Sequence, residues 1–171
     1  MKKVILTAFI FALMLVSGCK KENALVPVMP TDIISEAEAE AVIAEDYDII
    51  LEHNAVVDMG NNTYKASYIS EPVGAGDPVI VEVTYPSESL SGSEIKKLYF
   101  KSYDSRVNKR KIEGVGSEAF IAFPTLNILE EGHLIRITAG SGDTREQLDM
   151  LLSLGQTAVD NLRSYLNSND D

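Results

Sequence analysis

The sequence is short of the residues on which much protein chemistry depends. It has one cysteine, two histidines and no tryptophan among 171 residues. A single thiol excludes a disulfide framework within the chain and a thiolate metal cluster. The histidines, His53 and His133, have no second nitrogen or thiolate ligand at metal spacing, so no zinc site is predicted. We interpret both as surface histidines and expect no catalytic residue, no metal and no cofactor.

The usual active-site motifs are also missing. The sequence has no Gly-x-Ser-x-Gly turn to hold a nucleophilic serine. The glycine-rich stretch 140–144 lacks the lysine of a Walker loop and places Asp143 where a phosphate would bind, which indicates a turn with a helix cap. The acids of the first predicted helix are interpreted as a solvated face and not as a catalytic pair or a calcium site. These acids are Glu38, Glu45, Asp46, Asp48 and Glu52.

Positive charge is scarce and unevenly placed. The net charge is −11, which disfavours nucleic acid as a partner. Residues 31–60 contain nine acids and no lysine or arginine, whereas residues 96–111 contain seven basic residues and one acid. One interpretation is that both segments are solvated faces, which can pair with each other within the fold. The other is that the basic segment binds an anionic polymer, headgroup layer or partner. The candidate partner-binding residues are Lys97, Lys101, Arg110 and Lys111, together with the loop 74–77.

No apolar run approaches the length of about 20 residues that a membrane-spanning helix needs. The apolar core Val4–Val16 has 13 residues, follows two lysines and precedes two small residues. This is the layout of a secretory signal. The four residues Val16-Ser17-Gly18-Cys19 resemble a lipobox, the prokaryotic lipoprotein signal in which the cysteine becomes the first mature residue.

The lipobox resemblance implies acyl chains such as palmitate on Cys19, which would anchor the protein to a membrane on its extracytoplasmic side. The predicted location of the protein is then the cell membrane or, in a host with two membranes, the outer membrane. The outer membrane is favoured in such a host because Lys20 replaces the aspartate that resembles an inner-membrane retention signal. Removing residues 1–18 takes away two lysines and no acid, so the net charge falls to −13.

We divide the chain into four parts. A signal peptide (1–18) precedes a lipid-anchored tether (19–34), in which Pro27 and Pro30 disfavour a regular helix. A single globular domain (35–166) follows, and a disordered tail (167–171) ends the chain. Asn61-Asn62-Thr63 has glycosylation-acceptor spacing, and whether Asn61 is ever modified depends on the host.

Periodicity predicts eight elements in the order α-β-β-α-β-β-β-α. Capping-box spacings begin the helices at Ser35, Ser91 and Thr144. Alternating residues predict the strands. This order indicates an α+β domain, with an antiparallel sheet of about five strands packed with three helices. The predicted helices span 35–51, 92–106 and 144–165, and the strands span 64–69, 79–85, 118–123, 126–130 and 134–138.

The stretch from Gly114 to Gly140, followed by the leucine-rich last helix, resembles a layout met in small exported lipoproteins of unknown function. Some of these are similar to the Mog1/PsbP-like α+β fold. The resemblance implies a non-enzymatic binding or accessory role, with a protein or a small apolar molecule as ligand. The alternative is a small cell-envelope hydrolase, which requires His53 or His133 in a pocket beside an acid and a hydroxyl.

Overall fold

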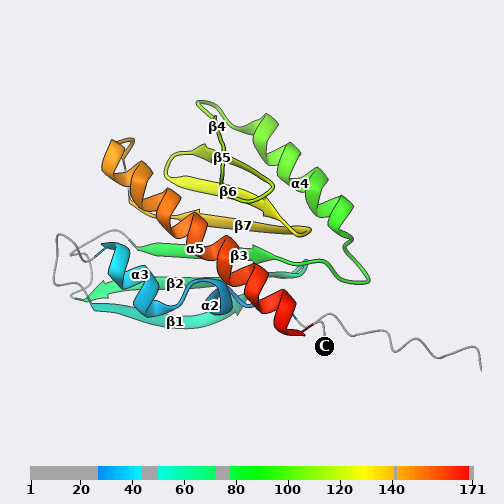
Figure 1. Ribbon diagram of the computed structural model, residues 1–171, viewed down its shortest axis with the longest axis horizontal. Helices are drawn as coiled ribbons and strands as arrows, with labels where there is room; N and C mark the ends of the chain where they lie inside the picture. Colours follow the sequence, from blue (N-terminus) through cyan, green and yellow to red (C-terminus); the bar gives the residue numbers. More distant parts are fainter. Residues whose placement is uncertain (1–26, 44–49, 72–77, 141, 170–171) are drawn as a thin grey trace, which may run out of the picture.

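The computed structural model describes residues 27–43, 50–71, 78–140 and 142–169 (Figure 1). Within them the predicted α+β class and antiparallel sheet are confirmed. The described residues form seven strands and four helices, so five strands and three helices were too few. In chain order the elements are α2 (Pro30–Ile33), α3 (Glu36–Ile43), β1 (Ile50–Asp58), β2 (Thr63–Glu71), β3 (Val79–Thr84), α4 (Gly92–Ser105), β4 (Arg110–Ile112), β5 (Glu118–Ala122), β6 (Thr125–Glu130), β7 (His133–Thr138) and α5 (Arg145–Asn169).

The sheet consists of two meanders joined side by side. Its strand order is β1-β2-β3-β7-β6-β5-β4, and every neighbouring pair is antiparallel. Consecutive strands pair within β1–β3 and within β4–β7, so only the β3–β7 pair joins strands that are distant in the chain. The short strand β4 and the long strand β1 form the two edges (Figure 1).

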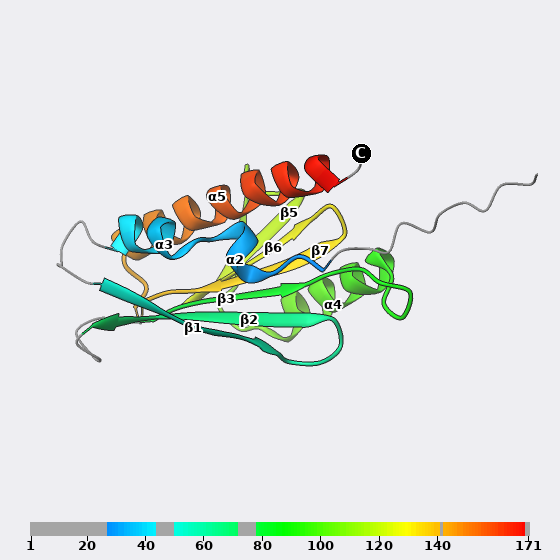
Figure 2. The ribbon, with the colours of Figure 1, turned by 90° about the horizontal axis from the view of Figure 1, so that it is seen from below.

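Helices α2, α3 and α5 cover one face of the sheet, and α4 lies on the other (Figure 2). The first face carries the main core because alternate residues of five strands point to it. Gly155 lets α5 approach closely: a Cβ there would lie 2.6 Å from Cδ2 of Leu126. The strand residues buried on this face are Ala66, Tyr68, Val79, Val81, Val83, Ala119, Ile121, Leu126, Ile128, Ile135 and Ile137.

The second face carries a smaller, aromatic cluster under α4. Ile95 and Tyr99 of the helix pack on Phe120, Leu129 and Leu134 of the sheet. The rings of Tyr99 and Tyr103 both meet Phe120 edge to face, with centroids 5.3 and 5.2 Å away. Such aromatic pairs fix the position of α4 over β5, β6 and β7.

The first predicted helix was too long. Helix α3 ends at Ile43, and Ile50 already belongs to β1, a strand that the sequence analysis did not predict. Gly60, Asn61 and Asn62 all have positive φ and form the turn that pairs β1 with β2. Glycine and asparagine tolerate this conformation better than other residues. From Ile50 onward, backbone pairing with β2 therefore overrode the helix that was predicted to run to residue 51.

The segment predicted as a tether contributes to the core. Val28, Ile33 and Ile34 are buried, and the hydroxyl of Tyr68 donates to the carbonyl of Ile34. Pro30 stands at the first turn of α2, where its missing N–H costs nothing. The packed domain thus begins before residue 35, and α5 continues to Asn169, beyond the predicted end at 166.

The predicted signal peptide and Cys19 lie outside the described residues. Among the helices that the structure describes, none has the length and apolar character needed to cross a membrane.

Candidate functional site

Helix α4 presents the basic residues of the candidate surface. Its start is fixed by the predicted capping box: the N–H of Ser91 donates to Oε2 of Glu94 at 2.8 Å, and the N–H of Glu94 donates to Oγ of Ser91 at 3.4 Å. Because Ile95 and Tyr99 are buried toward the sheet, Lys97 and Lys101 point outward and are exposed. The helix therefore displays two cations one turn apart.

The chain after α4 adds further cations at the sheet edge. Lys109 is held against the helix, because its Nζ donates to the carbonyl of Tyr103 at 2.7 Å and lies 4.0 Å from the ring centroid of that residue. Lys111 pairs with Phe120 in the sheet, which places it on the α4 side. Arg110 pairs with Ile121 and so leaves β4 toward the opposite face, near the ring of Phe123 at 6.0 Å.

The structure thus brings three of the four predicted binding residues to one side of the sheet. We call Lys97, Leu98, Phe100, Lys101 and Lys111, with the α4–β4 loop 106–109, the α4–β4 surface. Arg110 flanks it on the other side of the edge strand. Among the described residues, no carboxylate lies within 4 Å of Lys97, Lys101, Arg110 or Lys111. The predicted loop 74–77 lies outside the described residues.

Exposed apolar residues on this surface were not predicted. Leu98 and Phe100, both on α4, are each 41% exposed. Val107, in the loop after the helix, is 82% exposed. The helical period placed Phe100 outside the buried stripe, so its exposure could have been inferred from the sequence.

A buried ion pair lies at one end of the sheet face that α5 covers. The Glu130 side chain is 2% exposed and accepts from Arg163 at 2.7 Å and from the hydroxyl of Ser117 at 2.8 Å. Burial acts to raise the pKa of Glu130, but the bonds from Arg163 and Ser117 outweigh it and hold the pKa below its ordinary value. The carboxylate therefore stays charged and fastens α5 to the β6–β7 hairpin.

His133 is buried, so its interpretation as a surface histidine was wrong. The residue is 4% exposed and follows Glu130 across the hairpin turn, on the α5 face. Its Nδ1 lies 2.9 Å from the carbonyl of Glu131, to which it donates. Burial lowers the pKa of His133, which keeps the ring neutral near neutral pH. The side chain of His53, in β1, lies outside the described part.

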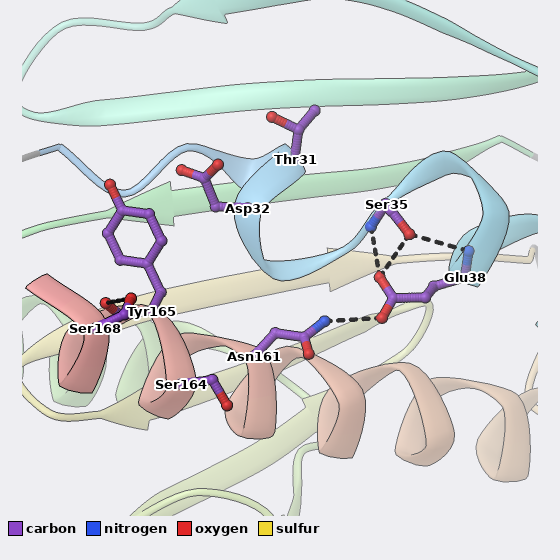
Figure 3. A pocket seen from close by; sticks show the side chains of 8 residues that line it. All are labelled: Thr31, Asp32, Ser35, Glu38, Asn161, Ser164, Tyr165 and Ser168. Carbon is purple, nitrogen blue, oxygen red and sulfur yellow. Dashed lines mark hydrogen bonds between the residues drawn. The ribbon is translucent and has the colours of Figure 1, made fainter.

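A shallow polar groove lies where the N-terminal helices meet the end of α5 (Figure 3). Nδ2 of Asn161 donates to Oε1 of Glu38 at 2.9 Å and to the carbonyl of Ile33 at 3.1 Å. Burial acts to raise the pKa of Glu38, but bonds from Ser35 and Asn161 outweigh it and lower the pKa. Glu38 joins α3 to α5, and the other acid of the groove, Asp32, accepts from the N–H of Met29 at 2.9 Å, so we interpret the groove as a structural junction. Its lining residues are Thr31, Asp32, Ser35, Glu38, Asn161, Ser164, Tyr165 and Ser168.

Within the described ranges, no group of three or more His, Cys, Asp and Glu residues is arranged to hold a metal ion. The acids predicted to form a solvated helix face are divided. Glu38 belongs to the junction, Glu52 lies in strand β1 and not in a helix, and Glu45, Asp46 and Asp48 lie outside the described residues.

Neither the ion pair of Glu130 nor the junction of Glu38 was predicted, because each joins residues that are far apart in the sequence. The only signal was one acid, Glu130, directly after Ile128 and Leu129 at the end of a mainly apolar strand.

Comparison with known proteins gives no further assignment. No protein-family model matches the chain, and searches of curated proteins and of solved structures return no match. The resemblance to small exported lipoproteins and to the Mog1/PsbP-like fold therefore stays a prediction.

Proposed function

We propose that the protein is a lipid-anchored extracytoplasmic module with a non-enzymatic binding or accessory role. The observation that carries the proposal is the α4–β4 surface, where Lys97, Lys101 and Lys111 are exposed and, among the described residues, have no carboxylate within 4 Å. Cations that are not neutralised within the fold are available to a partner of opposite charge.

The ion pairs of the described residues support this use of the surface. They join Lys96 to Glu118, Arg136 to Glu82, Arg145 to Asp149 and Arg163 to Glu130. None of them connects the basic segment 96–111 with the acidic segment 31–60. The two segments belong to different parts of the fold, since α3 and α4 lie on opposite faces of the sheet (Figure 2).

The anchoring part of the proposal rests on the lipobox-like residues 16–19. Its test is the intact mass of the protein recovered from the membranes of the producing cell. We expect a chain that begins at Cys19 and carries the added mass of acyl groups. The Cys19→Ala variant should be neither cleaved at that point nor acylated, and an unmodified thiol on the native protein would contradict the anchor.

The binding part is tested by isolating the protein from its own membranes in mild detergent. A partner that copurifies in stoichiometric amount should be lost when Lys97, Lys101 and Lys111 are changed to glutamate. Arg145→Glu is the control, because that side chain is 89% exposed and lies on α5. If both variants keep the partner, the α4–β4 surface is only a solvated face. A copurifying small apolar molecule would instead indicate a carrier or sensor.

The rival proposal, a small cell-envelope hydrolase, receives little support from the hydrogen bonds. A general base must contact the hydroxyl that it activates. Ser117 lies near the same strand end as His133, but its hydroxyl donates to Glu130, and His133 donates to the carbonyl of Glu131. Hydrolysis of a panel of ester and amide substrates that disappears in His133→Gln would favour the rival.

A further inference from the structure

The exposed large apolar residues of the described chain concentrate around α4. Val57 and Met59 lie at the β1–β2 turn, while Leu98, Phe100 and Val107 lie on α4 and in the loop after it. Val107 is the most exposed of the five, at 82%. The loop turns sharply at Asn108, which has a φ of 56°. Val107 directly follows Arg106, and Lys109 comes two residues after it.

Exposed apolar and basic side chains lie close together on this surface, with one exposed acid, Asp104, beside them. Lys97 and Phe100 are three residues apart on α4, as are Leu98 and Lys101, so each apolar side chain has a cation beside it. Lys96 adds a contact of the same kind, with its Nζ 5.7 Å from the ring centroid of Phe100. The affinity of a protein surface for a bilayer rises with the apolar area that it buries and with its attraction to anionic lipids.

We propose that the α4–β4 surface docks on the headgroup layer of an anionic bilayer. The cations pair with lipid phosphates, and Val107 and Phe100 enter the interface between them. This deepens the proposed function, on which it rests for bringing the domain near a membrane. It adds a second membrane contact that orients the domain.

The composition of the surface favours lipid over the two other anionic occupants. A phosphate-bearing polymer offers nothing to cover Leu98, Phe100 and Val107. A protein partner would cover them, but lysine is depleted from protein interfaces, and the cations here are mainly lysines. Because the net charge is −11, an anionic bilayer repels most of the molecule. The α4–β4 surface is therefore the side from which the domain approaches such a bilayer.

The length of chain before the domain limits how far the domain can lie from a membrane that holds Cys19. The described chain begins at Pro27, whose carbonyl accepts from Tyr165 of α5 at 3.4 Å, on the face opposite α4. The eight steps from Cys19 to Pro27 extend to at most roughly 28 Å. An acylated Cys19 therefore keeps the start of the domain within roughly 28 Å of the bilayer.

The test uses a tryptophan as a local probe, since the chain has none. Val107→Trp places it in the loop, and Val57→Trp, at a position 51% exposed on the other edge of the sheet, is the matched control. Each full-length variant is purified from its membranes and reconstituted into vesicles of phosphatidylcholine, with or without about 30% phosphatidylglycerol. Spin-labelled lipids then quench any indole at the bilayer surface.

We expect the indole of the Val107→Trp protein to be quenched, and its emission shifted to the blue, in the vesicles that contain phosphatidylglycerol. The effect should be much smaller in pure phosphatidylcholine, and the indole of the Val57→Trp control should respond in neither. Changing Lys97, Lys101 and Lys111 to glutamate in the Val107→Trp protein should lower the docked-to-undocked ratio at least about tenfold. Raising salt to about 1 M should have a similar effect.

Equal quenching of the indoles in the loop variant and in the control would overturn the proposal. So would quenching of the loop indole that ignores both phosphatidylglycerol and the glutamate substitutions. Shielding of the loop indole in native membranes alone would also overturn it and indicate a protein occupant. The intact mass of the same samples reports acylation of Cys19 separately, so a failed anchor and a failed docking surface are distinguishable.

Discussion

The two faces of the sheet differ in how completely they are covered. Helices α2, α3 and α5 cover the first face and bury a continuous apolar layer. On the second face, α4 covers one part, and a polar row crosses the neighbouring strands: Lys65, Glu82, Arg136 and Asn127 pair in register from β2 to β6. Stability therefore depends mainly on the first face, and the proposed binding surface lies on the second.

The largest expected effect comes from Leu126→Ala on the first face. The side chain is fully buried against Gly155 of α5, so its loss should leave a cavity and lower the free energy of unfolding by about 2–5 kcal/mol. Leu134→Ala, in the smaller cluster under α4, should cost about 2 kcal/mol because the rim of that cluster can relax. Urea unfolding with unchanged m values measures both. Equal losses of stability in the two variants would contradict the expectation that the first face contributes more.

A smaller effect is expected at Gly155, where the first face is tightest. Glycine to alanine inside a helix usually gains about 0.5–1 kcal/mol. Here the added Cβ would lie 2.6 Å from Leu126 and 3.3 Å from both Ile128 and Val115. Gly155→Ala should therefore destabilise the protein by about 1–3 kcal/mol. Ser153→Ala, at an exposed position of the same helix, serves as the control and should change stability little.

The pH dependence of stability tests the polar end of the first face. Burial holds the folded-state pKa of His133 below its ordinary value of 6.5. A depressed pKa gives a contribution to stability that is present above 6.5 and is lost as the pH falls below it toward the folded value. The native protein should therefore lose stability between about pH 7 and pH 5.

His133→Gln keeps a donor for the carbonyl of Glu131 and has no charge to gain. Its urea midpoint should fall less over the same pH range than that of the native protein. A native midpoint that is flat over this range would contradict the burial of His133.

The smallest effect is expected on the second face. Lys97 and Lys101 are exposed, and no described carboxylate lies within 4 Å of either. The double variant Lys97→Glu, Lys101→Glu should therefore change the free energy of unfolding by no more than about 0.5 kcal/mol. Thermal unfolding measures this directly. A large loss of stability would show that these lysines hold the fold together and would weaken their assignment to binding.

Local signals in the sequence predicted most of the fold. The capping boxes at Ser35 and Ser91 and the hairpin across Glu131-Gly132 depend on residues a few positions apart, and all three are present. Strands β4 and β1 and helix α2 were not predicted. Strand β4 has three residues, too few to show a period. Strand β1 has no regular alternation and depends on its pairing with β2. Helix α2 has four residues in a segment that contains two prolines.

The candidate surface was predictable because its residues are close in the sequence. Helix α4 and strand β4 are consecutive elements, so their cations appear as one basic segment. The face from which each side chain leaves was not predictable, because it depends on the sheet register: Lys111 opposes Phe120, whereas Arg110 opposes Ile121. The junctions of Glu38 with Asn161 and of Glu130 with Arg163 require the tertiary fold to be known.

The strand order also has a consequence for the folding pathway. Each meander can form from contacts between neighbouring segments, whereas the β3–β7 pair must bring Thr84 to Leu134, 50 residues further along the chain. Closing a loop of that length has an entropic cost that grows only slowly with loop length but precedes any stabilising contact. We expect the β3–β7 pairing to form late, after both meanders. Substitutions at Val81 or Ile137, which oppose each other across that pair, should then accelerate unfolding more than they slow folding.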